Sequence, residues 1–256
     1  MTDLNLPDLL RINMIIQYHI NDIQTETGLM RTSVFRPSKE GKYPTIIFYS
    51  EIFQQTSPIT RSAQILASHG FVVLVPEIFH ELNPQGNVLA YDDAGKDKGN
   101  ADKLTKPLEH HDSDTQAMVT FIQQQTYCTD KVSVMGVCIG GHLAFRAALN
   151  QQVTAAFCLY PTDIHSNTLP CTLGNDTLTR SIDIRCPMVL VFGKQDPHVS
   201  AKGRTLIHQT LSQNKCDFSW HEVNAQHAFM RDEGDRYDAA LAIQMYKMAI
   251  DFFTIP

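Results

Sequence analysis

The chain has 256 residues, of which 43% are hydrophobic and 19% charged, which excludes a disordered chain and supplies a sizeable core. The α/β folds often reach this length around one core, so we expect one domain over residues 1–256. The net charge is −6, and lysine and arginine are scattered rather than gathered into a basic stripe, so nucleic acid is not an expected partner.

The N-terminal segment contains Asp3 and Asp8 and lacks a basic start followed by an apolar run. This argues against a secretory signal, and we expect a cytoplasmic protein. The longest apolar runs, such as 71–76, have the length of strands and fall far short of the roughly 20 residues that cross a bilayer, so no membrane partner is expected. Six cysteines without C-x-x-C spacing are expected to be reduced, mostly as small core residues.

Short apolar segments bounded by glycine and proline alternate with helix-period segments from about residue 44 onward. This alternation predicts a mostly parallel sheet flanked by helices, in the α/β class. Two earlier segments alternate polar and apolar residues and predict an antiparallel start of the sheet. Strands are predicted at 12–20, 29–36, 44–50, 71–76, 131–136, 153–160, 187–193 and 217–223, and helices at 58–69, 113–126, 139–150, 200–212 and 237–253.

The segment 81–111 is rich in Gly, Asn, Asp and Lys and is too long for an ordinary connection. We expect it to be a surface excursion or a lid. Within it, Tyr91 is expected either to line a pocket or to anchor the loop. Asp112 or Ser113 is predicted to cap the helix that follows.

Residues 136–141 read G-V-C-I-G-G and lie between a predicted strand and a predicted helix. This is the context of a nucleophile elbow with cysteine as the nucleophile, which is typical of the α/β-hydrolase fold. Small residues on both sides of Cys138 are needed because larger side chains would collide in the turn. The helix start favours an anion, so the amide of Ile139 is the expected first oxyanion donor. A buried structural cysteine in a glycine-rich turn is the alternative interpretation.

In this fold the acid and the histidine follow the nucleophile along the chain. Asp196 follows the seventh predicted strand and His227 follows the eighth, so these two are the expected acid and base. Asp163 with His165, and His198, are the competing candidates. Only Asp196 and His227 supply an acid and a base after the last two strands.

Four sites along the chain resemble those of the dienelactone hydrolase family, and the resemblance extends from about residue 30 to the end. They are E-I-F at 51–53, the turn at 136–141, G-K-Q-D-P at 193–197 and H-A-F-M-R at 227–231. The resemblance implies an α/β-hydrolase fold with eight strands and an enzyme that cleaves an ester or lactone bond.

The resemblance also implies roles that the residues alone do not show. Glu51 contacts the cysteine in relatives and takes the thiol proton when substrate binds. The Ile52 amide becomes the second oxyanion donor, and Arg231 holds a substrate carboxylate, for which a planar guanidinium fork is well suited. Gln54 and Ala228 depart from the pattern of the best-known members, which argues against the dienelactone itself as the natural substrate.

The expected reaction is attack of the Cys138 thiolate on a carbonyl, followed by a thioester that His227, oriented by Asp196, helps to hydrolyse. The expected partner is a small ester or lactone, including carboxylate-bearing ones. Two alternatives stay open: an acyltransferase that passes the thioester to another acceptor, and a non-catalytic protein in which Cys138 is a redox or binding thiol.

Neither a cofactor nor a metal ion is expected. His110 and His111 stand beside Asp112, but neighbouring histidines point in different directions, and no further ligands lie at a supporting spacing. The sequence carries no signal of an oligomeric state.

Overall fold

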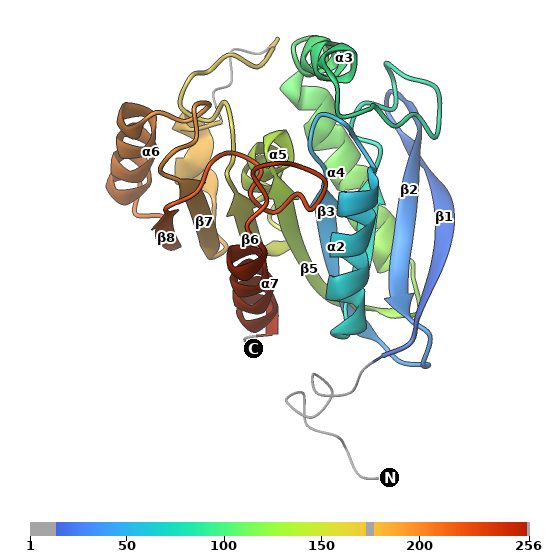
Figure 1. Ribbon diagram of the computed structural model, residues 1–256. Helices are drawn as coiled ribbons and strands as arrows, with labels where there is room; N and C mark the ends of the chain where they lie inside the picture. The colour runs from blue at the N-terminus through green and yellow to red at the C-terminus, as the bar shows by residue number, and fades with distance from the viewer. Residues whose placement is uncertain (1–13, 173–176, 255–256) are drawn as a thin grey trace.

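The computed structural model describes residues 14–172 and 177–254, and its centre is a twisted β-sheet (Figure 1). The strands are β1 (Ile16–Thr25), β2 (Gly28–Pro37), β3 (Tyr43–Tyr49), β4 (Val72–Pro76), β5 (Cys128–Val137), β6 (Val153–Leu159), β7 (Met188–Gly193) and β8 (Phe218–Val223).

Within the described residues these strands form one eight-stranded sheet in the order β1-β2-β4-β3-β5-β6-β7-β8. β2 pairs antiparallel with both β1 and β4, and every other neighbouring pair is parallel. This confirms the predicted fold class, a mostly parallel α/β sheet with an antiparallel start. The carboxyl ends of the parallel strands meet at one edge, where binding sites of such sheets form. The expected single domain over 1–256 stays a prediction, because the described residues do not cover that whole range.

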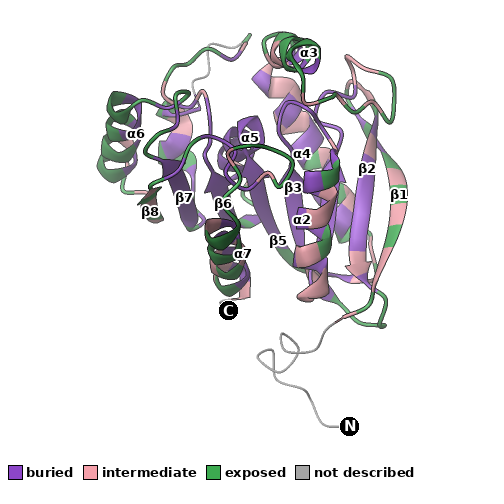
Figure 2. Cartoon of the chain, viewed as in Figure 1, coloured by how far each residue is buried: buried purple, intermediate pink, exposed green. Residues whose placement is uncertain are grey.

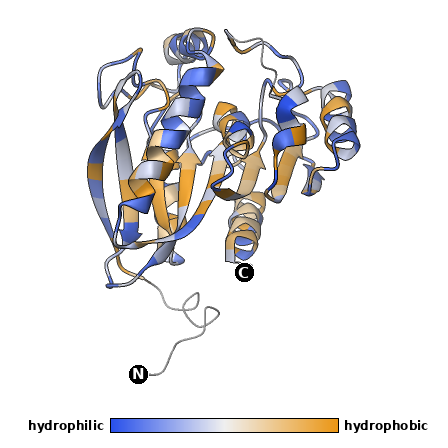
Figure 3. Cartoon of the chain, turned by 180° about the vertical axis from the view of Figure 1, so that it is seen from behind, coloured by the Kyte–Doolittle hydropathy of each residue, from blue (hydrophilic) through white to orange (hydrophobic). Residues whose placement is uncertain are grey.

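Helices cover both faces of the sheet (Figures 1 and 3). α2 (Ser57–Ser68) packs beside α7 (Ala239–Thr254) on one face, whereas α4 (Leu108–Gln123) and α5 (Ile139–Ala147) cover the other. α6 (Ala201–Gln213) lies beside β7 and β8, and a short 3-10 helix, η1 (Thr179–Asp183), precedes β7. None of the helices in the described ranges has the length and apolar character needed to cross a bilayer.

The core lies between the central strands and the inner faces of the helices, where burial and apolar character coincide (Figures 2 and 3). All five residues of β4 are buried, as expected for a parallel strand covered on both faces. The six cysteines, which all lie within the described ranges, are free, as predicted, and four of them are buried.

The first strand differs from its prediction at 12–20: it runs from Ile16 to Thr25, and residues 12 and 13 lie outside the described part of the chain. The reason is a tight hairpin in which Thr25 pairs with Gly28 across two turn residues. Gly28 has φ 134, which residues with a side chain rarely adopt. The turn fixes the register, so the strand extends to meet it.

Helix α4 begins at Leu108, so the prediction that Asp112 or Ser113 caps it is wrong. Pro107 takes the cap position without a side-chain cap. Asp112 instead pairs with Arg146 at 2.7 Å, and the Ser113 hydroxyl donates to a backbone carbonyl one turn earlier at 3.0 Å. Both side chains therefore have partners inside the fold that the local sequence does not reveal.

The segment 81–111 contains a helix, α3 (Asp93–Lys103), that the sequence pattern did not predict. Asp92 caps it by accepting from the Gly95 amide at 2.7 Å. Only Gly95, Gly99 and Asp102 of this helix are buried, so it lacks the apolar stripe by which helices are recognised in sequences. α3 lies over the carboxyl edge of the sheet (Figure 1).

Candidate active site

Cys138 occupies the turn between β5 and α5, at the carboxyl edge of the sheet. Its backbone has φ 60 and ψ −125, a region that costs strain energy for a residue with a side chain. A Cβ atom on Gly136 would lie 1.9 Å from the Gly140 carbonyl oxygen, and one on Gly140 would lie 2.2 Å from that of Tyr49. Glycine is therefore required at both positions, and the tight turn presents Cys138 above the sheet.

His227 and Asp196 lie beside Cys138. His227 Nδ1 is 2.7 Å from Asp196 Oδ2, and the His198 backbone amide donates to Asp196 Oδ1 at 2.8 Å. The Cys138 side chain lies near enough to the His227 ring for the two groups to interact electrostatically. Both oxygens of Asp196 are thus engaged, which fixes the orientation of the imidazole between carboxylate and sulfur. The structure brings together one residue from the loop after each of β5, β7 and β8.

The residues around His227 favour its protonated, positively charged form. Burial opposes its protonation, but the charge of Cys138 and the hydrogen bond to Asp196 raise the pKa of His227 to about 10. A protonated imidazole stabilises negative charge on a neighbouring sulfur. The His198 ring meets the His227 ring edge-on with centroids 4.6 Å apart, and burial and the charge of His227 lower the pKa of His198.

The two backbone amides expected to stabilise an oxyanion flank this group. Ile139 is the first residue of α5, so its amide has no acceptor within the helix. Ile52 is a central residue of the turn closed by the Gln54 amide on the Glu51 carbonyl at 3.0 Å, and its own amide makes no backbone hydrogen bond within the described part of the chain. Both residues are buried at the same edge of the sheet as Cys138.

Glu51 follows β3 and is 4% exposed. Its Oε1 accepts from the Tyr91 hydroxyl at 2.6 Å, and its Oε2 lies 3.6 Å from Arg231 Nη1. The Arg231 guanidinium also lies 4.4 Å from the centre of the Tyr91 ring. Burial raises the pKa of Glu51, and Arg231 and Tyr91 oppose that rise. Glu51 and Cys138 line the same pocket, and among the described residues no hydrogen bond joins them, so the contact that the resemblance implies stays a prediction.

A pocket of about 180 Å³ opens over Cys138 and is lined by Glu51 and His227 as well. Asp163, one of the competing acids, also lines it but pairs with Lys103 at 3.1 Å rather than with a histidine. Four cationic side chains line this pocket among the described residues: Lys96, Lys103, Arg231 and Arg236.

Two kinds of pocket residue were missed by the sequence analysis. Lys96, Asn100 and Lys103 come from α3, and their spacing would have placed them on one face had the helix been recognised. Arg236 follows the expected Arg231 in the loop after β8, and no local pattern marks it. Tyr91 anchors its loop, because its hydroxyl group bonds Glu51 at 2.6 Å and Thr56 at 2.7 Å, but it is not one of the described residues that line the pocket.

The histidines considered as metal ligands point apart. His110 Nδ1 lies 2.9 Å from Glu81 Oε1, whereas the His111 ring packs against Phe79 with centroids 6.1 Å apart. In the described part of the chain, the group that gathers ligand atoms within 4.8 Å of one another is Asp196, His198 and His227. The direct bond between Asp196 and His227 already engages an atom of each.

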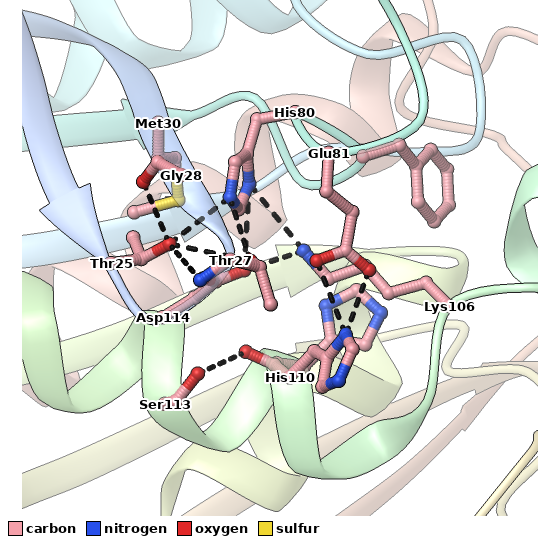
Figure 4. A network of polar contacts seen from close by, with 12 residues as sticks. Thr25, Thr27, Gly28, Met30, His80, Glu81, Lys106, His110, Ser113 and Asp114 are labelled. Carbon is pink, nitrogen blue, oxygen red and sulfur yellow. Dashed lines mark hydrogen bonds and ion pairs between the residues drawn. The ribbon is translucent and has the colours of Figure 1, made fainter.

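A second group of buried charges lies under the β1–β2 hairpin; we call it the Lys106 network (Figure 4). Lys106 Nζ is 2.6 Å from Asp114 Oδ2 and 3.4 Å from His80 Nδ1. His80 Nε2 lies 3.1 Å from the hydroxyls of both Thr25 and Thr27. Burial and the charge of Lys106 lower the pKa of His80 against the opposing effect of Asp114. The network joins the hairpin, the loop after β4 and helix α4.

Known proteins resemble this chain over most of its length. The model of the "Dienelactone hydrolase family" matches residues 30–255. A protein of Saccharomyces cerevisiae described as "Putative carboxymethylenebutenolidase" is 41% identical over 241 residues, covering 89% of this chain and 88% of its own. The carboxymethylenebutenolidase of Pseudomonas putida is 26% identical over 212 residues, covering 82% and 84%. The crystal structure of a "Putative Dienelactone Hydrolase" from Klebsiella pneumoniae matches with a TM-score of 0.83 and 18% identity, covering 94% of this chain and 100% of that one.

Proposed function

The chain belongs to the dienelactone hydrolase family, and we propose that it hydrolyses an ester or lactone bond with Cys138 as the nucleophile. In this proposal His227 is the general base and acid, and Asp196 orients it. The observation that carries it is that Cys138, on a strained turn at a helix start, lines one pocket with His227, and that His227 is hydrogen-bonded to Asp196. Relatives named carboxymethylenebutenolidase support the reaction class.

The reaction would begin with attack of the Cys138 thiolate on the carbonyl carbon. The oxyanion accepts hydrogen bonds from the Ile52 and Ile139 amides. The tetrahedral intermediate collapses to a thioester and expels the alcohol oxygen, which takes a proton from His227. His227 then removes a proton from water, and the resulting hydroxide attacks the thioester, expels the thiolate and forms the carboxylic acid, which loses its proton to solvent and leaves as the carboxylate. Lactones and activated esters suit a thiolate better than amides, because the thiolate is itself easily expelled.

Glu51 and Arg231 supply a link between substrate binding and the thiol. Arg231 faces Glu51 at 3.6 Å, so a substrate carboxylate that binds Arg231 competes with Glu51 for the same guanidinium. The released Glu51 would turn toward Cys138 and accept the thiol proton, and the thiolate formed in this way is the charge that favours a protonated His227. Burial raises the pKa of Glu51, which makes this carboxylate a better proton acceptor than an exposed one.

Hydrolysis of p-nitrophenyl acetate by wild type, Cys138→Ala and His227→Ala tests the proposal. We expect both variants to lose hydrolysis while their unfolding transitions stay close to that of wild type. Unchanged rates in both would contradict the proposal and leave Cys138 as a redox or binding thiol. Product analysis with and without an added alcohol or thiol separates the hydrolase from an acyltransferase, which would make the transfer ester or thioester in place of the free acid.

A further inference from the structure

We propose that His198 is a further catalytic residue, which holds the water molecule that hydrolyses the thioester. In this role the His198 imidazole accepts a hydrogen bond from one hydrogen of the water while His227 removes the other as a proton. The inference rests on the proposed hydrolase function and deepens it, because a held water favours transfer of the acyl group to water over transfer to another acceptor.

His198 lies beside the proposed base in the pocket. It is one of the described residues that line the pocket together with Cys138 and His227. Its ring meets the His227 ring edge-on, with centroids 4.6 Å apart. A nitrogen of His198, a nitrogen of His227 and a carboxylate oxygen of Asp196 all lie within 4.8 Å of one another. Two hydrogen bonds of about 2.8 Å to one water span roughly 4.5 Å, so a single water can bridge the two rings.

The backbone holds His198 in this place. The His198 amide donates to Asp196 Oδ1 at 2.8 Å, so the acid that orients His227 also anchors the residue that carries the second ring. His227 uses Nδ1 for Asp196 Oδ2 at 2.7 Å, which leaves Nε2 as its nitrogen for a proton of water. Because a backbone amide makes the anchoring bond, a side-chain substitution at His198 removes the ring and keeps that bond.

The surroundings of His198 favour its neutral form, which has a nitrogen lone pair that accepts a hydrogen bond. Burial and the charge of His227 lower the pKa of His198, and Lys103 acts in the same direction, whereas Asp196 and Asp163 oppose it. Within the described part of the chain no protein group is hydrogen-bonded to the ring nitrogens of His198. The lone pair is therefore available to a water in the pocket.

The held water completes the second half of the reaction. Once the leaving alcohol has taken the proton of His227, Nε2 of that ring is again a base. The water gives one proton to Nε2 and bonds His198 through its other hydrogen, and its oxygen attacks the thioester carbonyl carbon. The O–C bond forms, the C–S bond breaks and the thiolate leaves, while His198 neither gains nor loses a proton. The second hydrogen bond removes rotational freedom that one bond would leave to the water.

The test separates acylation from deacylation in a single turnover, with enzyme in excess over p-nitrophenyl acetate. Release of p-nitrophenol measures acylation, and loss of the acetyl group from Cys138, followed by acid quenching and mass spectrometry, measures deacylation. His198→Phe keeps a ring for the edge-on contact but has no acceptor, whereas His198→Gln keeps an acceptor without the ring. The matched control is His208→Gln on α6, which removes an exposed ring that meets the Trp220 ring edge-on with centroids 5.2 Å apart.

We expect His198→Phe to slow deacylation about ten- to a hundredfold, as for a misplaced reactant, while acylation stays within about threefold of wild type. His198→Gln should deacylate faster than His198→Phe, and the control should match wild type. Deacylation at the wild-type rate in His198→Phe, or a His198→Gln variant slower than His198→Phe, would overturn the inference, because ring packing would then be the role of His198. Equal slowing of acylation and deacylation would overturn it too, because that pattern indicates a structural role.

Hydroxylamine gives a readout that bypasses the held water, since this nucleophile attacks a thioester without a general base. It should remove the acetyl group from Cys138 at the same rate in His198→Phe and in wild type. Slower removal in the variant would show a distorted pocket and overturn the inference. If wild type forms no acetyl group on Cys138, the proposed function itself fails; if Cys138 is acetylated but His198→Phe deacylates like wild type, only the role of His198 fails.

Discussion

Two buried histidine–aspartate pairs in this molecule have opposite charge preferences. His227 bonds Asp196 at 2.7 Å beside the pocket, and its pKa is raised to about 10. His80 lies 3.7 Å from Asp114 in the Lys106 network, and its pKa is lowered. Burial opposes protonation in both pairs. Around His227 the charge of Cys138 and the hydrogen bond to Asp196 outweigh burial, whereas around His80 burial together with the Lys106 ammonium outweighs Asp114.

The comparison separates a site that can react from a network that stabilises. The group around His227 faces a pocket where a substrate can reach the sulfur. Lys106 and Asp114 have side chains 0% and 4% exposed, and they tie α4 to the hairpin below the segment that carries α3. A histidine beside an aspartate is therefore not enough to indicate catalysis; access and the charge of the third group are also needed.

The largest expected effect is on activity. His227→Gln should reduce kcat for ester hydrolysis by about a thousand- to ten-thousandfold, about 4–5 kcal/mol, because the thioester loses the base that activates water for deacylation. The free energy of unfolding should change by less than about 1 kcal/mol. His80→Gln is the matched control, and it should keep kcat/KM within about threefold. Equal losses of activity in the two variants would remove the distinction between the pairs.

The next effect is on stability. Lys106→Met removes the cation that pairs with the buried Asp114 carboxylate, so the free energy of unfolding should fall by about 3–5 kcal/mol in urea denaturation. Activity per folded molecule should be retained. The double variant Lys106→Met, Asp114→Leu should recover most of the loss, because no buried charge is left. A single variant as stable as wild type would show that the network does not stabilise the fold.

The pH dependence of stability follows from the neutral histidines. Burial lowers the pKa of His80 and of His111 in the folded state, whereas both ionise near pH 6.5 when unfolded. Unfolding below that pH takes up protons, so the free energy of unfolding should fall by up to about 1.4 kcal/mol per pH unit for each histidine. His227 adds no slope there, since its raised pKa keeps it protonated in both states. His80→Gln should flatten the fall between about pH 6 and pH 5, and an unchanged slope would contradict this account.

The smallest effect concerns Tyr91. Its hydrogen bond lowers the pKa of Glu51, so Tyr91→Phe should raise that pKa and move the acidic limb of the kcat/KM profile to higher pH. We expect a shift of up to about one pH unit, the effect of one hydrogen bond to a charged group. Tyr246→Phe, which removes a hydroxyl bonded to Ser62 at 2.7 Å, is the matched control. An unmoved limb in Tyr91→Phe would argue against proton transfer to Glu51.

The order and type of the strands could be predicted because apolar periodicity and glycine turns are local signals. α3 could not, since a polar helix capped by Asp92 and packed through Gly99 shows no amphipathic stripe. The start of α4 was misplaced because Asp112 is engaged by Arg146, which lies far along the chain. Local patterns do not contain such long-range partners.

Local patterns in the sequence likewise predict only part of the candidate active site. The turn around Cys138 and the placement of Asp196 and His227 after successive strands follow from chain order, and the structure brings these three together. The partners of Glu51 do not follow from it, because Tyr91 reaches the carboxylate from a segment 40 residues away. The cations of α3 were hidden together with their helix.

The proposal that Cys138 is the nucleophile is tested most directly by trapping its acyl form. His227→Gln lacks the base for deacylation, so incubation with p-nitrophenyl acetate, acid quenching and peptide mass spectrometry should detect one acetyl group on Cys138, removable by neutral hydroxylamine as a thioester is. An acetyl group on another residue, or hydrolysis by Cys138→Ala at the wild-type rate, would contradict the proposed nucleophile.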